Sequence, residues 1–139
     1  MGRLLAVDFG TKRIGLAETD PLQIIASALD TVENKKIFEF LDGYLKREKV
    51  DEIIVGEPRQ KDGSPSESEK YIKLFIEELE KKHPHIPIKR HDESYTSKMA
   101  FQTMIDSGIG KKARRNKGLI DKISATIILQ SYMEIKERF

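Results

Sequence analysis

Three acidic residues stand at positions where a carboxylate is costly unless it has a partner. Asp8 ends a short apolar run, Glu93 ends a predicted buried-type strand, and Asp121 lies on an apolar helical face. Carboxylates that are brought together repel one another unless a divalent cation neutralises them. Because the chain has no cysteine, such a cluster offers only oxygen ligands, which select Mg²⁺ or Mn²⁺. Two such ions, about 4 Å apart, promote hydrolysis of a phosphodiester.

Each acid also has a structural interpretation. Asp8 fits a turn cap at the end of a strand, and Glu93 fits a carboxylate that favours the N-terminal dipole of a following helix. Asp121 fits a salt bridge to an arginine. Taken singly, the three acids leave both interpretations open, and the argument for a site depends on whether the fold gathers them.

Short segments of buried-strand type are predicted to carry the first two acids. Buried strands are expected at 3–9, 51–56 and 86–92. Residues 13–19 are expected to form a hairpin with 3–9, and 24–31 a third antiparallel strand. If 3–9 and 86–92 are parallel neighbours, Asp8 and Glu93 lie at the carboxyl edge of one sheet. Ligands bind at that edge in open α/β sheets.

Apolar residues at helical spacing predict the elements that cover the sheet, over 33–48, 66–82, 96–105 and 118–136. Ser66 and Glu69 fit a capping box for the second helix. On the last helix, Asp121 shares a face with Ala125 and Ile128, so that face is expected to pack inward. The alternation of strands and helices predicts an α/β fold with a mixed sheet, antiparallel at first and then parallel.

Length and composition set the remaining limits. The 139 residues, 38% hydrophobic and 35% charged, are expected to form one domain over 1–139. No apolar run reaches the roughly 18 residues that span a bilayer, and residues 1–10 lack the apolar region of a signal peptide. The expected location is therefore cytoplasmic, without a membrane partner. A monomer or a weak homodimer is expected.

The basic residues are placed to hold a phosphate backbone, although the net charge is only +2. Lys12 and Arg13 follow Asp8 directly, and the segment 111–117 (KKARRNK) leads into the helix of Asp121. The alternative for this segment is a solvated loop. Thr96 and Ser97 fit phosphate contacts or ordinary N-capping. The candidate nucleic-acid contacts are Lys12, Arg13, Thr96, Ser97, Lys111, Lys112, Arg114, Arg115 and Lys117.

Four segments together resemble the YqgF/RuvX family of RuvC-like nucleases with an RNase H fold. They are DFGTKRIGLA at 8–17, VGEP with DG within 55–63, DESYTS at 92–97 and KGLIDKISATIILQSYM at 117–133. The resemblance implies an RNase H-like fold with a five-stranded sheet. It also implies that the catalytic, metal-binding acids are Asp8, Glu93 and Asp121.

The resemblance further implies a substrate. Members of this family are associated with trimming the 5′ end of the 16S ribosomal RNA precursor, and an earlier proposal was resolution of Holliday junctions. Structured RNA, alone or in ribosomal precursor particles, is therefore the expected partner, and a DNA junction is the alternative. This chain departs from the family pattern at Ser94, where an arginine is usual, and at Glu57 and Arg59, where neutral residues are common.

Two further functions compete with a nuclease. In a non-catalytic RNA-binding assembly module, the three acids would be structural, and Mn²⁺ binding separates this reading from an enzyme. ATP phosphotransfer of the actin-like type shares the DxGT pattern that begins at Asp8. It needs two such domains, and 139 residues supply one.

Overall fold

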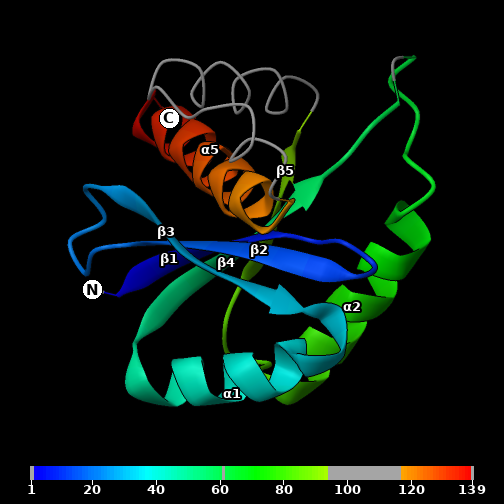
Figure 1. The fold of residues 1–139 in the computed structure, drawn as a ribbon. Helices are drawn as coiled ribbons and strands as arrows, with labels where there is room; N and C mark the ends of the chain where they lie inside the picture. Colours follow the sequence, from blue (N-terminus) through cyan, green and yellow to red (C-terminus); the bar gives the residue numbers. More distant parts are fainter. Residues whose placement is uncertain (1, 61, 94–116, 139) are drawn as a thin grey trace.

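The computed structural model describes residues 2–60, 62–93 and 117–138, with the side chains of the last segment described over 123–136 (Figure 1). Its sheet has the strand order β3-β2-β1-β4-β5. The strands β1, β2 and β3 pair antiparallel, whereas β1, β4 and β5 pair parallel. The predicted α/β fold with a mixed five-stranded sheet is confirmed. The strands are β1 (Arg3–Asp8), β2 (Arg13–Thr19), β3 (Ala26–Glu33), β4 (Val50–Glu57) and β5 (Ile88–Asp92).

Helices cover both faces of this sheet. The short η1 (Asn34–Lys36) leads into α1 (Ile37–Arg47), which lies with α2 (Glu69–Lys82) on one face. On the opposite face lies α5 (Lys117–Arg138) (Figure 1). The sheet is therefore the middle layer of three, and each of its faces is buried against helices.

The alternation of side chains along β1 assigns Asp8 to the α5 face. Leu5 and Val7 belong to the apolar cluster shared with α1 and α2. Leu4 and Ala6 belong to the cluster shared with α5. Because side chains alternate between the faces of a strand, Asp8 continues the series of Leu4 and Ala6.

The contacts of α5 show the direction in which it crosses the sheet. Tyr132 and Lys136 both reach the carboxylate of Glu52, near the start of β4. Ile128 lies beside Gly56, near the end of β4. The helix therefore runs antiparallel to β4, and its N-terminal turns continue beyond Gly56 toward the carboxyl edge of the sheet.

The third strand begins two residues later than the sequence pattern predicts. The Asp20 carboxylate accepts hydrogen bonds from the backbone N–H groups of Leu22, Ile24 and Ile25, at 2.8 to 3.1 Å. These bonds, which also lower the pKa of Asp20, satisfy the backbone locally. Residues 24 and 25 thus form part of a loop, and pairing with β2 starts at Ala26.

The predicted capping box at the start of α2 is wrong. The helix begins at Glu69 with Ser68 as its N-cap, and no side chain caps the helix there. The Ser66 hydroxyl instead contacts the Ser68 hydroxyl at 2.7 Å. Glu69 is drawn away from the cap because its carboxylate pairs with Arg90 on β5.

Other boundaries differ slightly from the predictions. The strand expected over 86–92 begins at Ile88, although Ile86 is buried in the core. The helix expected over 96–105 lies outside the described residues. Within the part of the chain that the structure describes, no helix is long and apolar enough to cross a membrane.

Candidate active site

Asp8 and Glu93 come together at the carboxyl edge of the sheet, although one strand lies between theirs. Val7 of β1 pairs with Val55 of β4, which places Asp8 level with Gly56. On the other side, the Glu93 backbone N–H donates to the carbonyl of Glu57 at 3.1 Å, one position past β5. The Glu93 side chain then reaches across β4 and shares a hydrogen bond with the Asp8 carboxyl.

The crossing depends on the absence of a side chain at Gly56. A Cβ atom on Gly56 would lie 2.6 Å from Cδ and 2.8 Å from Oε2 of Glu93. It would also lie 2.9 Å from Cδ1 of Ile128 on α5. The Glu93 carboxyl therefore rests directly over the backbone of β4, in a space that α5 closes from above.

A hydrogen bond between two carboxyl groups needs a proton, so this contact favours a protonated carboxyl when no cation is bound. Burial is the main cause that raises the pKa of Glu93, and the charges of Asp92 and Glu69 raise it further. The hydrogen bond with Asp8 and the positive charge of Arg90 act in the opposite direction. The pair is thus a compact set of carboxyl oxygens in which burial opposes the ionisation of Glu93.

Arg90 fastens the ends of β4 and β5 to α2. Its guanidinium donates to both oxygens of Glu69, at 2.7 and 3.2 Å. It also donates to the carbonyl of Gly56 at 3.0 Å and to that of Val55 at 3.3 Å. The backbone beneath the Glu93 carboxyl is therefore held from the α2 side of the sheet.

Arg59, one of the departures from the family pattern, pairs with two acids at the ends of β4 and β5. Its guanidinium bonds the carboxylate of Glu57 and lies 3.2 Å from the carboxylate of Asp92. Glu57 in turn lies within 3.9 Å of Arg90. These contacts tie the chain after β4 to the end of β5, and they account for a charged pair at positions where the family usually has neutral residues.

Asp121 lies on α5, but its side chain is not among those that the structure describes. Asp121 precedes Ile128 by seven residues, which is close to two turns and about 10 Å of helix. Ala125 and Ile128 are fully buried, so the face predicted to pack inward does so at these positions. Because α5 runs antiparallel to β4, Asp121 lies beyond Gly56, toward the edge that carries Asp8 and Glu93.

Other predicted contacts are partly described. Lys12 is exposed in the turn between β1 and β2, and Arg13, the first residue of β2, is half-buried. Gly10 is required in this turn because a Cβ there would lie 2.2 Å from the Arg13 carbonyl oxygen. The remaining candidates have no described side chain, namely Thr96, Ser97, Lys111, Lys112, Arg114, Arg115 and Lys117.

His91 shares the α5 face with Glu93 but is used in packing. Its Nε2 lies 2.8 Å from the hydroxyl of Ser131, and its ring meets Tyr132 edge-on at 6.1 Å. Burial lowers the pKa of His91. Within the described residues, no group of three or more His, Asp or Glu side chains forms a metal cluster.

Sequence reasoning missed Gly56 and Arg90. Gly56 follows the apolar run of β4, and a glycine at that point is a signal for close approach of another group. Arg90 lies inside a short strand, where an arginine needs a buried partner. Neither signal identifies the partner, because Glu69 and Glu93 come from different elements.

Comparisons with known proteins agree with this architecture. The RuvC structure from T. thermophilus in complex with a Holliday junction substrate superposes with a TM-score of 0.58 at 16% identity, over 97% of this chain and 96% of that one. The fold is therefore RuvC-like, with the acids at the edge where its parallel strands end. The family model described as "RuvX: Holliday junction resolvase" matches residues 2–135, and the chain belongs to the RuvX family.

Close relatives match nearly the whole chain. A protein from Christiangramia forsetii is 53% identical over 133 residues, covering 96% of this chain and 98% of its own length. One from Flavobacterium johnsoniae is 51% identical over 136 residues, covering 98% and 99%. Both carry the name "Putative pre-16S rRNA nuclease".

Proposed function

We propose that this protein is a divalent-metal-dependent nuclease that hydrolyses phosphodiester bonds during 5′-end maturation of the 16S ribosomal RNA precursor. The observation that carries the proposal is the contact between the Asp8 and Glu93 carboxyls across Gly56. Two half-buried carboxyls, from the end of β1 and from the residue after β5, repel each other when both are ionised, so their close approach calls for a reason. A site that takes a cation explains it.

The donor set fits a hard metal ion. Asp8 and Glu93 supply carboxylate oxygens, and we assign the third ligand to Asp121 because α5 carries it toward the same edge. Mg²⁺ or Mn²⁺ prefers such ligands and would supply the Lewis acidity that phosphodiester hydrolysis needs. The same three residues are our proposed catalytic residues.

The chain's own residues hold the substrate and the ligands in place. Arg90 fixes the backbone under Glu93, and α5 closes the site from above. Lys12 and Arg13, next to Asp8 in sequence, are proposed phosphate contacts, as are Thr96, Ser97 and the cations of 111–117. Such contacts give affinity without reading the base sequence.

The names of the close relatives support RNA as the substrate class. The protein would then act in the cytoplasm, on free precursor RNA or on precursor particles, as a monomer or a weak homodimer. The test is cleavage of a precursor segment that contains the 5′ end, with Mg²⁺, with Mn²⁺ and with a chelator.

Asp8→Asn is the decisive variant. It keeps the shape of the side chain and removes the charge, so activity should fall at least about 100-fold while the fold is retained. A matched control is Asp20→Asn, which alters a carboxylate in the β2–β3 loop far from the site. Full cleavage by Asp8→Asn or by Asp121→Asn would exclude the proposed chemistry.

A four-way DNA junction is the second candidate substrate, supported by the description of the family model. A resolvase must cut two opposed strands, which calls for two sites related by a two-fold axis. Parallel assays with a junction and with precursor RNA, combined with sedimentation at assay concentration, separate the two. If a dimer cleaved the junction in preference to the RNA, the substrate would be a DNA junction and not precursor RNA.

A further inference from the structure

An open groove of about 840 Å³ lies on the face of the sheet opposite α5. It runs between the start of α1 and the start of α2, next to the turn that follows Asp8. This volume is in the range of small-molecule sites, roughly 300–1,000 Å³. The side chains that matter below are Phe9, Thr11, Phe38, Tyr71, Leu74 and Phe75.

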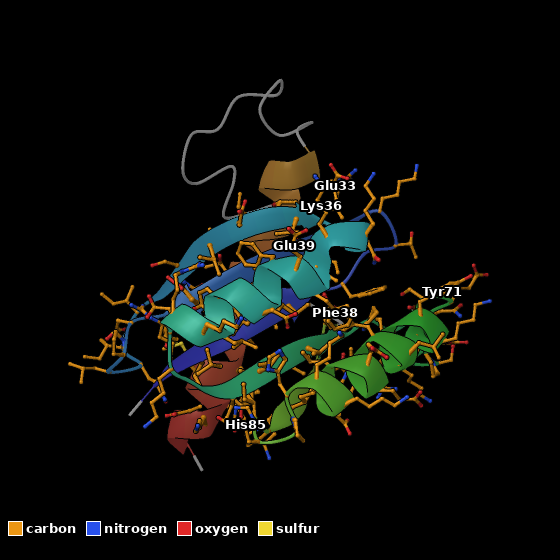
Figure 2. All side chains as sticks on the ribbon, turned by 90° about the horizontal axis from the view of Figure 1, so that it is seen from below. Glu33, Lys36, Phe38, Glu39, Tyr71 and His85 are labelled. Carbon is orange, nitrogen blue, oxygen red and sulfur yellow. The ribbon has the colours of Figure 1, made fainter. Side chains whose placement is uncertain are left out.

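The floor and walls of the groove are aromatic. Phe75 of α2 meets the ring of Phe9 at 5.3 Å and that of Phe38 at 5.5 Å between centroids. Above this floor, Tyr71 and Leu74 are 45% and 61% exposed. Figure 2 shows Phe38 coming from α1 and Tyr71 from α2. A large apolar surface left in water at the mouth of a groove is typical of a binding site.

Lysine side chains accompany these rings. The Lys70 ammonium lies 5.0 Å from the centroid of the Tyr71 ring, and that of Lys82 lies 5.5 Å from the centroid of Phe38. Lys35 and Glu78 both contribute to the lining, and the Lys35 ammonium lies 3.4 Å from the Glu33 carboxylate. Aromatic faces combined with cations are the usual composition of surfaces that bind single-stranded nucleic acid, in which bases stack and phosphates meet positive charge.

The groove lies beside the turn that follows Asp8, on the other face of the sheet from the Asp8 carboxyl. Phe9 directly follows Asp8, and its side chain enters the groove while Asp8 belongs to the α5 face. Thr11, in the turn between β1 and β2, lies in the lining. Asn34 holds this turn in place, because its side chain donates to the Gly10 carbonyl at 2.7 Å and its backbone N–H donates to that of Lys12 at 2.9 Å.

We infer that this groove binds an unpaired nucleobase of a single strand that flanks the cleaved phosphate. The inference rests on the proposed nuclease function and names its substrate class as RNA with a single-stranded flank. To reach both places, the strand must bend around the edge of the sheet at Thr11. A flexible single strand bends in this way, whereas a duplex is stiff over far longer distances.

The test measures binding separately from cleavage. In an Asp8→Asn background without metal, a short single-stranded RNA carrying a fluorescent adenine analogue is titrated, and a blunt RNA duplex of the same sequence serves as the comparison. Tyr71→Ala should weaken single-strand binding about fivefold or more and leave duplex binding unchanged. Tyr71→Phe keeps the ring and should restore binding.

Two further variants guard against a loss of folding. Leu74→Glu changes a largely exposed side chain, and the new carboxylate should weaken single-strand binding by repelling phosphate. Leu22→Ala, at a side chain that is 66% exposed on the β2–β3 loop, should have no effect. In a protein that retains Asp8 and is assayed with metal, Tyr71→Ala should raise KM for single-stranded RNA and leave kcat unchanged. The reason is that the base is bound equally in the ground and transition states.

Unchanged single-strand binding in both Tyr71→Ala and Leu74→Glu would overturn the inference and make a protein partner the better occupant of the groove. Equal losses for single strand and duplex would overturn it as well. Neither result bears on the nuclease proposal, which fails independently if Asp8→Asn still cleaves.

Discussion

The carboxyl group of Glu93 lies where the side chain of any other residue at position 56 would be. The distance of 2.6 Å between a Cβ on Gly56 and the Glu93 Cδ is shorter than atoms in contact allow. A glycine is therefore needed at position 56 to leave space for the Glu93 carboxyl, and not because of the backbone conformation there. The space left by the missing side chain lets Glu93, just after β5, reach Asp8 at the end of β1.

Gly56→Ala should displace Glu93 and separate it from Asp8. We expect a loss of Mn²⁺ affinity and of cleavage by at least about tenfold, with a destabilisation of about 1–3 kcal/mol from overpacking against Ile128. Titration calorimetry with Mn²⁺ and urea unfolding measure the two effects. Wild-type Mn²⁺ affinity in this variant would show that Glu93 does not need the space over β4.

The matched control is Gly43→Ala in α1, where the nearest atom to an added Cβ lies 3.4 Å away on the Arg47 side chain. An alanine in a helix is more stable than a glycine by about 1 kcal/mol or less. This variant should therefore be as stable as the wild type or slightly more stable, with unchanged metal binding.

The stability of the metal-free protein should depend on Glu93 in a pH-dependent manner. Because burial raises the pKa of Glu93 in the folded state, ionisation of this carboxyl opposes folding. The cost is absent below the pKa of the unfolded chain and develops as the pH rises through the raised folded pKa. Glu93→Gln should thus be more stable than the wild type at neutral pH, and the difference should disappear in acid.

Thermal unfolding across this pH range, with a chelator present, checks the sign. Added Mn²⁺ should reverse the order at neutral pH, because it stabilises only the protein that binds it. A Glu93→Gln variant less stable than the wild type at neutral pH without metal would contradict a carboxyl whose ionisation is costly.

Arg90 and Glu69 should behave as a buried pair. Glu69 is only 8% exposed, so Arg90→Met leaves its charge without compensation and should cost about 3 kcal/mol or more. Combining Arg90→Met with Glu69→Leu should recover much of this loss. The double-mutant cycle is measured by urea unfolding, and additive losses would show that the two side chains do not depend on each other.

Tyr132 should help to hold α5 in register with β4. Its hydroxyl donates to the Glu52 carboxylate at 3.1 Å, and burial is the main cause that raises its pKa to about 12. Tyr132→Phe should cost about 1 kcal/mol. Tyr71→Phe, which removes a hydroxyl from an exposed ring on the other face of the sheet, should cost much less in the same unfolding assay.

Much of this protein is determined by local pattern in the sequence. The apolar runs around β1 and β4 and the helical spacing in α1, α2 and α5 predicted the elements, and the alternation predicted a mixed sheet. Local pattern failed where a polar side chain had two possible partners. Residues 24 and 25, predicted to belong to the third strand, instead donate backbone hydrogen bonds to the Asp20 carboxylate. Glu69, predicted to cap α2, instead pairs with Arg90.

The sequence by itself also singled out three acids, namely Asp8 at the end of an apolar run, Asp121 on an apolar helical face and Glu93 at the end of a predicted strand. Only the tertiary structure decided that Asp8 and Glu93 touch, since the strand order β1-β4-β5 leaves β4 between them. Their contact depends on a side chain that is missing from Gly56, on the closing helix α5 and on the anchor at Arg90. These are relationships between distant parts of the chain, and no local pattern contains them.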